Sequence, residues 1–185
     1  MSPQSLPVSA FVTDAHLSPH TPALVVLGGL PGVGKTTIAR QLAVALSAVH
    51  MRIDSIEQAL RDAGVTVWDH GYRVAYTVAE DNLRVGRTVV ADCVNPWPLT
   101  RRAWQAVADR VAVRAVTVEL ICSDVGEHER RVESRMPDIA NHRVPTWLEV
   151  MAHDYRPWDS ERLVVDTARL SIPQSVQAIV SALAS

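Results

Sequence analysis

The stretch Leu24-Val-Val-Leu-Gly-Gly-Leu-Pro-Gly-Val-Gly-Lys-Thr-Thr-Ile-Ala-Arg40 decides the fold of this chain. Four of its residues stand in the spacing G-x-x-x-x-G-K-[ST]: Gly29, Gly34, Lys35 and Thr36. This spacing is the P-loop or Walker A pattern, in which a glycine-rich loop joins a strand to a helix. The pattern is meaningful only if a strand precedes it and a helix follows it.

Both neighbours of the loop can be read from the sequence. Residues 23–27 form a short apolar, β-branched run that is typical of a buried strand. Residues 35–48 place apolar side chains at helical spacing, which predicts an amphipathic helix. The context that the pattern requires is therefore present on both sides, and an ordinary glycine-rich turn is the weaker interpretation.

The loop chemistry predicts a nucleoside triphosphate site. Glycines allow a positive φ and a close approach of the backbone to a ligand, so that successive N–H groups can hold phosphate oxygens. A lysine at this position supplies positive charge for the β- and γ-phosphates, and the following hydroxyl can hold Mg²⁺. The residues that we expect to bind nucleotide are Gly29, Gly32, Val33, Gly34, Lys35, Thr36 and Thr37.

The composition is that of one globular domain. The chain has 185 residues, of which 48% are hydrophobic and 21% are charged. Its net charge of -2 argues against a general nucleic-acid binder. Cys93 and Cys122 lie in or beside apolar runs and are expected to be buried free thiols. We see neither a signal peptide nor a run of membrane-spanning length, so the cytoplasm is the default location.

The rest of the chain alternates strands and helices. Residues 1–22 are rich in proline and serine and predict a flexible lead-in to a domain over 23–185. Further strands are expected at 49–53, 88–91, 111–121 and 163–165, and helices at 55–62, 72–85, 101–109, 124–136, 145–154 and 173–184. Thr100 is expected to cap the helix over 101–109. This alternation predicts an α/β fold with a parallel sheet that helices cover on both faces.

Two aspartates follow predicted strands, at the sheet edge where such folds bind ligands. Asp92 ends an apolar strand, which is the Walker B arrangement for holding Mg²⁺ together with Thr36; the alternative is a simple cap. Asp54 follows the second strand and could take the proton from an attacking hydroxyl. It could instead cap the next helix, because Glu57 stands at the capping-box position.

Two arginines are candidates for contacts with the transferred phosphate. Arg131 and Arg135 are four residues apart, so they share one face of a predicted helix. On a lid that closes over phosphates, their guanidinium groups would stabilise developing negative charge. The alternative is pairing with the glutamates of the same helix on a solvated face. The lid would span about residues 124–145.

Taken together, these motifs resemble the small P-loop kinases of the AAA-family ATPase, zeta-toxin-like and chloramphenicol phosphotransferase-like group. The resemblance covers residues 23–184 and rests on five segments in this order: 28–37, 52–57, 89–96, 129–135 and 163–167. It implies a five-stranded sheet of order 2-3-1-4-5 with a helical lid. It also implies ATP and Mg²⁺ as cofactors, an Asp base at Asp54 and lid arginines at Arg131 and Arg135.

The first functional hypothesis is therefore an ATP-dependent kinase. It would move the γ-phosphate of Mg-ATP to a hydroxyl of a small acceptor such as a metabolite, nucleoside or antibiotic. One alternative is a P-loop NTPase that only binds or hydrolyses nucleotide in a regulatory role. Another is a polynucleotide 5′-kinase, which is disfavoured because Glu57 occupies the neighbourhood where such enzymes usually carry an arginine. Neither a nucleic acid nor a membrane is expected as a partner.

Overall fold

The opening stretch forms strand β1 (Ala23–Gly28), a loop and helix α1 (Lys35–Ala45). The computed structural model describes residues 21–185. Every residue of β1 is buried, because the strand lies in the middle of the sheet and helices cover both of its faces. A continuous apolar run without polar alternation is what such a central strand requires.

The sheet has five parallel strands in the order β2-β3-β1-β4-β5. The other four strands are β2 (Val49–Arg52), β3 (Val89–Asp92), β4 (Arg114–Ile121) and β5 (Leu163–Asp166). The predicted fold class and strand order are both confirmed. Because all strands are parallel, their carboxyl ends meet at one edge, where the loop after β1 also begins.

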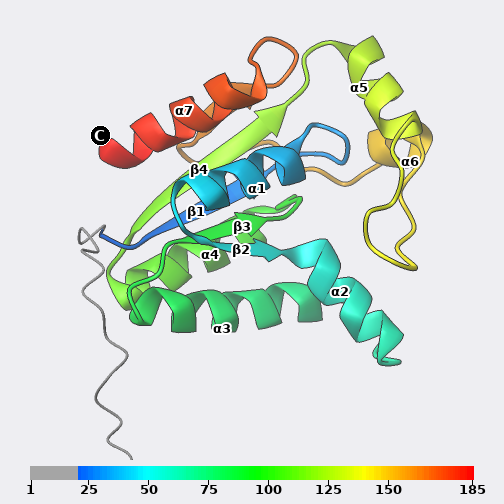
Figure 1. Ribbon diagram of the computed structural model, residues 1–185. Helices are drawn as coiled ribbons and strands as arrows, with labels where there is room; N and C mark the ends of the chain where they lie inside the picture. The colour runs from blue at the N-terminus through cyan, green and yellow to red at the C-terminus, as the bar shows by residue number, and fades with distance from the viewer. Residues whose placement is uncertain (1–20) are drawn as a thin grey trace, which may run out of the picture.

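Helices cover both faces of the sheet (Figure 1). Beyond α1 they are α2 (Ile53–Asp62), α3 (His70–Arg84), α4 (Pro98–Val111), α5 (Val125–Glu133), α6 (Trp147–Met151) and α7 (Ile172–Ala184). Helices α1 and α7 lie on one face, and α3 and α4 lie on the other. Helices α5 and α6 lie beyond the carboxyl ends of the strands, over the site described below.

The core consists of two apolar clusters, one on each face of the sheet. Successive side chains of a strand point to opposite faces, so β1 contributes to both clusters. Val25 and Leu27 belong to the cluster under α1 and α7. Leu24 and Val26 belong to the cluster under α3 and α4, which also holds the fully buried Trp104. This double anchorage fixes the end of β1 and therefore the start of the phosphate loop.

Helix α4 begins earlier than the sequence predicts. Pro98 occupies its first turn and Trp97 is the N-cap residue, so the prediction that Thr100 caps this helix is wrong. The Thr100 hydroxyl donates instead to the carbonyl oxygen of Trp97. Proline suits the first turn because it lacks the N–H that would be unpaired there and its φ is already helical.

Three other boundaries differ from the prediction, and the first of them lies in a uniform apolar run, which does not distinguish a helix end from a strand. The fourth strand was predicted from residue 111, but Val111 still belongs to α4 and Ala112 turns the chain with φ 56°. Helix α5 ends at Glu133, before Pro137 is reached. Helix α6 is short because it begins only at Trp147, after a capping box formed by Thr146.

Three expectations from composition have different outcomes. Cys93 and Cys122 are free and buried, as predicted. Within residues 21–185, no helix combines the length and the apolar character that crossing a membrane would need. The predicted flexible segment of residues 1–22 falls, up to residue 20, outside the described residues.

The buried guanidinium of Arg101 joins the loop after β3 to the segment before β5. It donates to four backbone carbonyl oxygens, those of Asn95 at 3.1 Å, Pro96 at 3.0 Å, Arg156 at 2.6 Å and Pro157 at 2.9 Å. It also lies 4.0 Å from the ring centroid of Trp158. One cation thus satisfies the polar backbone of two connections that have no strand or helix of their own.

We expect Arg101→Met to lower the free energy of unfolding by about 3 kcal/mol, because four carbonyl oxygens lose their charged donor in a buried place. For a chain of this size that corresponds to a melting temperature lower by about 6–12 °C. Thermal unfolding followed by circular dichroism measures the effect. Arg102→Met is the matched control, since Arg102 is exposed and should tolerate the change. Equal melting temperatures of the two variants would contradict this role.

Candidate functional site: a phosphate loop facing two carboxylates

The phosphate loop leaves the N-terminus of α1 open. Gly34 is the N-cap residue in the left-handed conformation, with φ 95°, and no side chain caps the helix. The first backbone N–H groups of α1 are therefore free to bind an anion, and the helix dipole favours negative charge there. A Cβ on Gly32 would lie 2.5 Å from Cγ2 of Val132, so this glycine also lets α5 pack against the loop.

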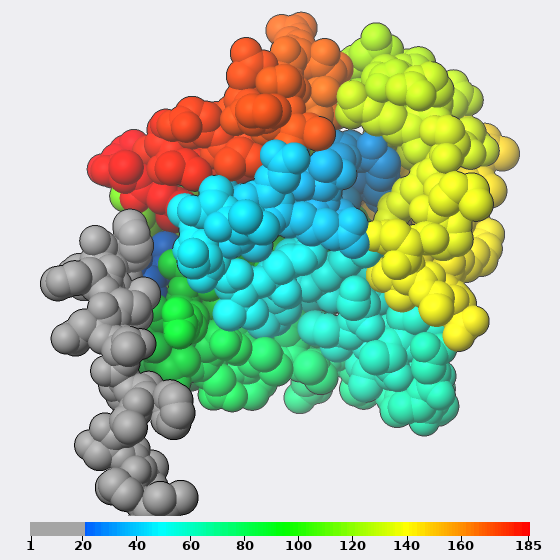
Figure 2. Space-filling view, in the orientation of Figure 1, coloured from blue at the N-terminus to red at the C-terminus, as the bar shows by residue number. Residues whose placement is uncertain are grey.

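A pocket of about 990 Å³ opens beside the loop. Eight of the predicted site residues line it: Gly32, Gly34, Lys35, Thr36, Thr37, Asp54, Arg131 and Arg135. In Figure 2 the loop, in blue, lies at the bottom of a hollow between the cyan surface of α1, the orange segment after β5 and the yellow segment after α5. The volume is sufficient for a nucleotide together with a small second molecule.

Three predicted residues do not line this pocket. The amide of Gly29 donates to the carbonyl oxygen of Val94, and Val33 is buried beneath the loop. Asp92 lies deeper, at the end of β3, with 3% of its surface exposed. The other eight predicted residues lie at the surface of the pocket, together with residues that the sequence did not single out, such as Arg40 and Asp138.

Lys35 is buried at the base of the pocket. Its Nζ donates to the carbonyl oxygen of Leu30 at 2.8 Å, which holds the ammonium group inside the loop. Burial lowers the pKa of Lys35, although the charges of Asp92 and Asp54 act in the opposite direction. It is the only lysine among the 18 lysine and arginine residues of the chain.

Asp92 and Thr36 offer the oxygen ligands that Mg²⁺ prefers. The Oδ2 atom of Asp92 is buried and has no hydrogen-bond partner among the described residues. Burial alone would raise the pKa of this carboxyl, but the neighbouring His50, Lys35 and Thr36 outweigh it and lower the pKa. An ionised carboxylate whose buried Oδ2 accepts no hydrogen bond, with His50 Nε2 no closer than 3.6 Å, and which lies close to a threonine hydroxyl, fits a divalent cation or its water.

Asp54 lies in the first turn of α2, not before it. The N-cap residue is Arg52 and no side chain caps the helix, so the interpretation of Asp54 as a capping residue is wrong. Glu57 does not complete a capping box either, because its carboxylate pairs with Arg61 at 3.0 Å. The Asp54 carboxylate faces the pocket, and its nearest cation is Arg52, with 3.7 Å between Oδ2 and Nη2.

Arg131 pairs with a glutamate of its own helix, as one of the two interpretations predicted, and also reaches Thr167 at the pocket; its contact with phosphate stays a prediction. Its Nε donates to Glu127 at 2.7 Å, and its Nη1 donates to the hydroxyl of Thr167 at 2.9 Å. Hydrogen bonds from Arg130 and Arg131 lower the pKa of Glu127 to about 2. Thr167 also bonds to the carbonyl oxygen of Val33, so a chain of contacts connects α5 with the phosphate loop.

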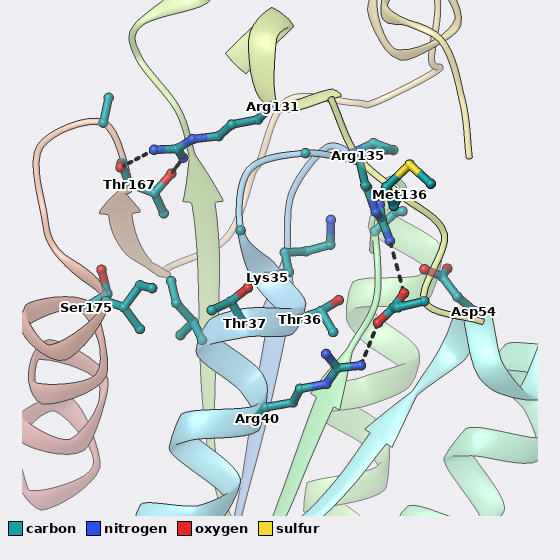
Figure 3. A pocket seen from close by; sticks show the side chains of 18 of the residues that line it. Lys35, Thr36, Thr37, Arg40, Asp54, Arg131, Arg135, Met136, Thr167 and Ser175 are labelled. Carbon is teal, nitrogen blue, oxygen red and sulfur yellow. Dashed lines mark hydrogen bonds and ion pairs between the residues drawn. The ribbon is translucent and has the colours of Figure 1, made fainter. Parts of the chain in front are cut away.

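Arg135 lies on the other side of the pocket (Figure 3). In that view Arg131 points toward Thr167, whereas Arg135 lies on the side of Asp54. Its Nη2 is 4.0 Å from a carboxylate oxygen of Asp138. The pocket thus has one arginine at each side of Lys35, each contributed by α5 or the segment that follows it.

Two further residues contribute to the site, and no sequence motif indicates their roles. His128 is buried on α5, and its Nε2 lies 2.8 Å from the carbonyl oxygen of Pro31, which holds α5 on the phosphate loop. Asp138 binds the arginines of α1 and β2, although residues 138–144 read only as a polar connection. Both contacts join segments that lie far apart in sequence, where spacing patterns give no information.

Thr167→Val tests the connection between Arg131 and the phosphate loop. The change keeps the shape but removes a hydroxyl that accepts from Arg131 and donates to a backbone carbonyl, a loss of about 1 kcal/mol. We expect the dissociation constant of Mg-AMPPNP, measured by calorimetry, to rise about fivefold. Thr77→Val, which removes an exposed hydroxyl on α3, is the control. An unchanged dissociation constant in Thr167→Val would show that this connection does not support the loop.

Comparison with solved structures shows the same fold in known kinases. The APS kinase of Mycobacterium tuberculosis in complex with AMPPNP and APS superposes with a TM-score of 0.69 at 18% identity, over 90% of this chain and 100% of that chain. A gluconokinase from Sinorhizobium meliloti superposes with a TM-score of 0.60 at 19% identity, over 89% of this chain and 93% of that chain. At these identities the likeness concerns the fold.

Sequence comparison gives a shorter match and a family. An uncharacterized protein of Mycobacterium tuberculosis is 37% identical over 60 residues, which is 32% of this chain and 12% of that protein. The match thus spans about an eighth of the length of this relative. The family described as AAA domain (AAA_33) matches residues 24–155, from β1 to the segment before β5. The chain has the P-loop kinase fold and belongs to this AAA domain family.

Proposed function

We propose that this protein is an ATP-dependent phosphotransferase that moves the γ-phosphate of Mg-ATP to a hydroxyl group of a small acceptor. The observation that carries the proposal is the position of Asp54, a carboxylate that caps nothing and faces the same pocket as Lys35 and Thr36. A nucleotide site that only holds its ligand has no need for a free carboxylate on this side. The kinases with the same fold support the proposal.

The proposed reaction uses residues from three sides of the pocket. Asp54 accepts the proton of the acceptor hydroxyl while the hydroxyl oxygen attacks the γ-phosphorus. The bond between that phosphorus and the bridging oxygen to the β-phosphate breaks, and ADP leaves. Lys35 stabilises the charge that develops on the phosphate oxygens, together with Arg131 and Arg135.

Thr36 and Asp92 would hold Mg²⁺, which supplies charge neutralisation for the β- and γ-phosphates when it is bound. Residues of the chain bind the phosphates, position the lysine and exclude water. The open N-terminus of α1 binds the phosphates. The hydrogen bond from Lys35 Nζ to the carbonyl oxygen of Leu30 holds the ammonium group beside them. We propose that α5 and the segment up to about residue 145 act as the lid that excludes water from this pocket.

Acceptor-dependent consumption of ATP tests the function. The purified protein is incubated with Mg-ATP and a library of hydroxyl compounds, and ADP release is followed in a coupled assay. Stimulation by an acceptor, with a phosphorylated product in mass spectrometry, supports the proposal. ATP hydrolysis that no acceptor changes, and that Asp54→Asn leaves undiminished, would favour an NTPase instead. Labelling of a 5′-hydroxyl oligonucleotide would favour a polynucleotide 5′-kinase.

A further inference from the structure

Three arginines converge on one carboxylate beside the proposed catalytic residues. Arg52 binds both oxygens of Asp138, with Nη1 2.9 Å from Oδ2 and Nη2 3.0 Å from Oδ1. Arg40 of α1 donates to Oδ2 at 2.6 Å. Arg135 completes the group from the side of α5, at 4.0 Å. Asp54 and Asp92 lie farther from Arg52, at 3.7 and 3.9 Å, so Asp138 is the carboxylate that Arg40 and Arg52 bind directly.

The arginine at the centre of this group is fixed, and its charge is buried. Arg52 ends β2, and only 6% of its surface is exposed. Its Nε has no hydrogen-bond partner among the described residues, and the carboxylate of Asp92 lies 3.9 Å away. A buried guanidinium that loses its hydrogen-bonded anion is costly, and Asp54, 3.7 Å from Nη2, is too far to replace Asp138 as a hydrogen-bond acceptor, so Arg52 favours an anion in the place of Asp138.

Asp138, in contrast, stands on a segment with little support of its own. It lies between α5 and α6, where no strand or helix is formed. Some backbone N–H groups of residues 134–146 donate to backbone carbonyl oxygens. All of these acceptors lie in the same segment or in α5. Asp138 also lines the pocket, whereas Arg52 is not among the residues that line it. The carboxylate can therefore leave at small cost in backbone hydrogen bonds, provided that another anion replaces it.

We propose that Arg40 and Arg52 form a binding site for an oxyanion of the acceptor, with Arg135 at its edge toward the transferred phosphate, and that Asp138 occupies this site while no acceptor is bound. The inference rests on the proposed function and names its substrate class: a hydroxyl compound that also carries a carboxylate, sulfate or phosphate ester. Arg52 Nη2 lies 3.7 Å from the carboxylate of Asp54. An acceptor held by its anion at Arg52 thus has its hydroxyl within reach of Asp54.

A polynucleotide 5′-kinase was disfavoured because Glu57 occupies the place after Asp54 where such enzymes usually carry an arginine. The structure has its arginine two residues before Asp54, at the end of the strand, and adds Arg40 from another element.

The first arm of the test measures anion binding without turnover. Inorganic sulfate is titrated by calorimetry into the full-length protein with saturating Mg-AMPPNP, which keeps the phosphate loop filled. Asp138→Asn removes the competing carboxylate and should bind sulfate at least about tenfold more tightly than the wild type. Adding Arg52→Met to Asp138→Asn should abolish that gain. Asp81→Asn, an exposed aspartate on α3, is the control and should behave as the wild type.

Equal sulfate affinity in the wild type, Asp138→Asn and the double variant would overturn the inference and make Asp138 a fixed part of the fold. Circular dichroism checks that each variant is folded. If the double variant with Arg52→Met is not folded, Arg40→Met in the Asp138→Asn background takes its place. The comparison of the single and double variants isolates this site even if AMPPNP fails to bind, an outcome that would refute only the proposed function.

The second arm compares acceptors in matched pairs: a hydroxy acid with its amide, and a phosphate ester of a diol with the free diol. We expect kcat/KM for the anionic member to exceed that for the neutral member at least about tenfold, and Arg52→Met to remove the difference by raising KM. A preference for the acid or for the phosphate ester identifies which oxyanion the site accepts. Equal use of the charged and neutral members would refute the substrate class.

Discussion

Replacing Lys35 by methionine is expected to lower ATP turnover by about 10²- to 10³-fold, because the phosphates lose the one cation that the loop itself supplies. Methionine has a similar length and an apolar stem, so the space inside the loop stays filled. The dissociation constant of Mg-AMPPNP should also rise. Calorimetry and the coupled ADP assay measure the two effects separately.

The same variant should remain folded. The pKa of Lys35 is lowered from its usual value near 10.5 by burial, which means that folding disfavours the protonated form. A base with a lowered pKa reduces stability at every pH below its value in the unfolded chain, which includes neutral pH. Removing the charge should therefore leave the melting temperature unchanged or higher. A clear fall in melting temperature would show that the loop needs Lys35 for its own structure.

The second large effect is expected for Asp54→Asn. Loss of the proton acceptor should lower kcat for acceptor phosphorylation by about 10²- to 10⁴-fold. Binding of Mg-AMPPNP should remain within a few fold of the wild type, because Asp54 lies on the side of the pocket that we propose for the acceptor. The measurement is the initial rate of product formation at saturating acceptor, beside calorimetry with the nucleotide analogue.

Glu57→Gln is the matched control for this variant. Glu57 is a carboxylate on the same helix, one turn away, but it pairs with Arg61 and does not line the pocket. Its removal should leave kcat unchanged. A normal rate in Asp54→Asn, or an equal loss in both variants, would remove Asp54 from the proposed mechanism.

The donor half of the site could be predicted because its information is local. The spacing of the loop residues and the periodicity on either side define a strand, a turn and a helix within about twenty residues. The order of the strands came from a resemblance, and topology confirmed it. Asp92 at the end of β3 and Asp54 shortly after the end of β2 could be found because parallel strands bring their carboxyl ends to one edge.

The proposed acceptor half was not predictable in the same way. Arg52 and Asp138 are 86 residues apart, and local spacing patterns carry no information on a contact over that separation. Local cues also competed with each other: Asp54 and Glu57 match a capping box, but the helix begins before them, at Ile53. Patterns of three or four residues cannot decide such cases, because the packing of distant segments selects the helix start.

The single lysine of the chain has a practical consequence for studying the protein. Reagents that acylate ε-amino groups have one target in 185 residues, apart from the N-terminal amine, and it lies in the phosphate loop. Because burial lowers its pKa, more of this amine is neutral and nucleophilic at a given pH than in an exposed lysine. An ATP analogue with an acyl phosphate would thus label one site, and the labelled fraction in mass spectrometry would report nucleotide occupancy directly. Coupling the protein to a support through its lysine would, by the same logic, block the pocket.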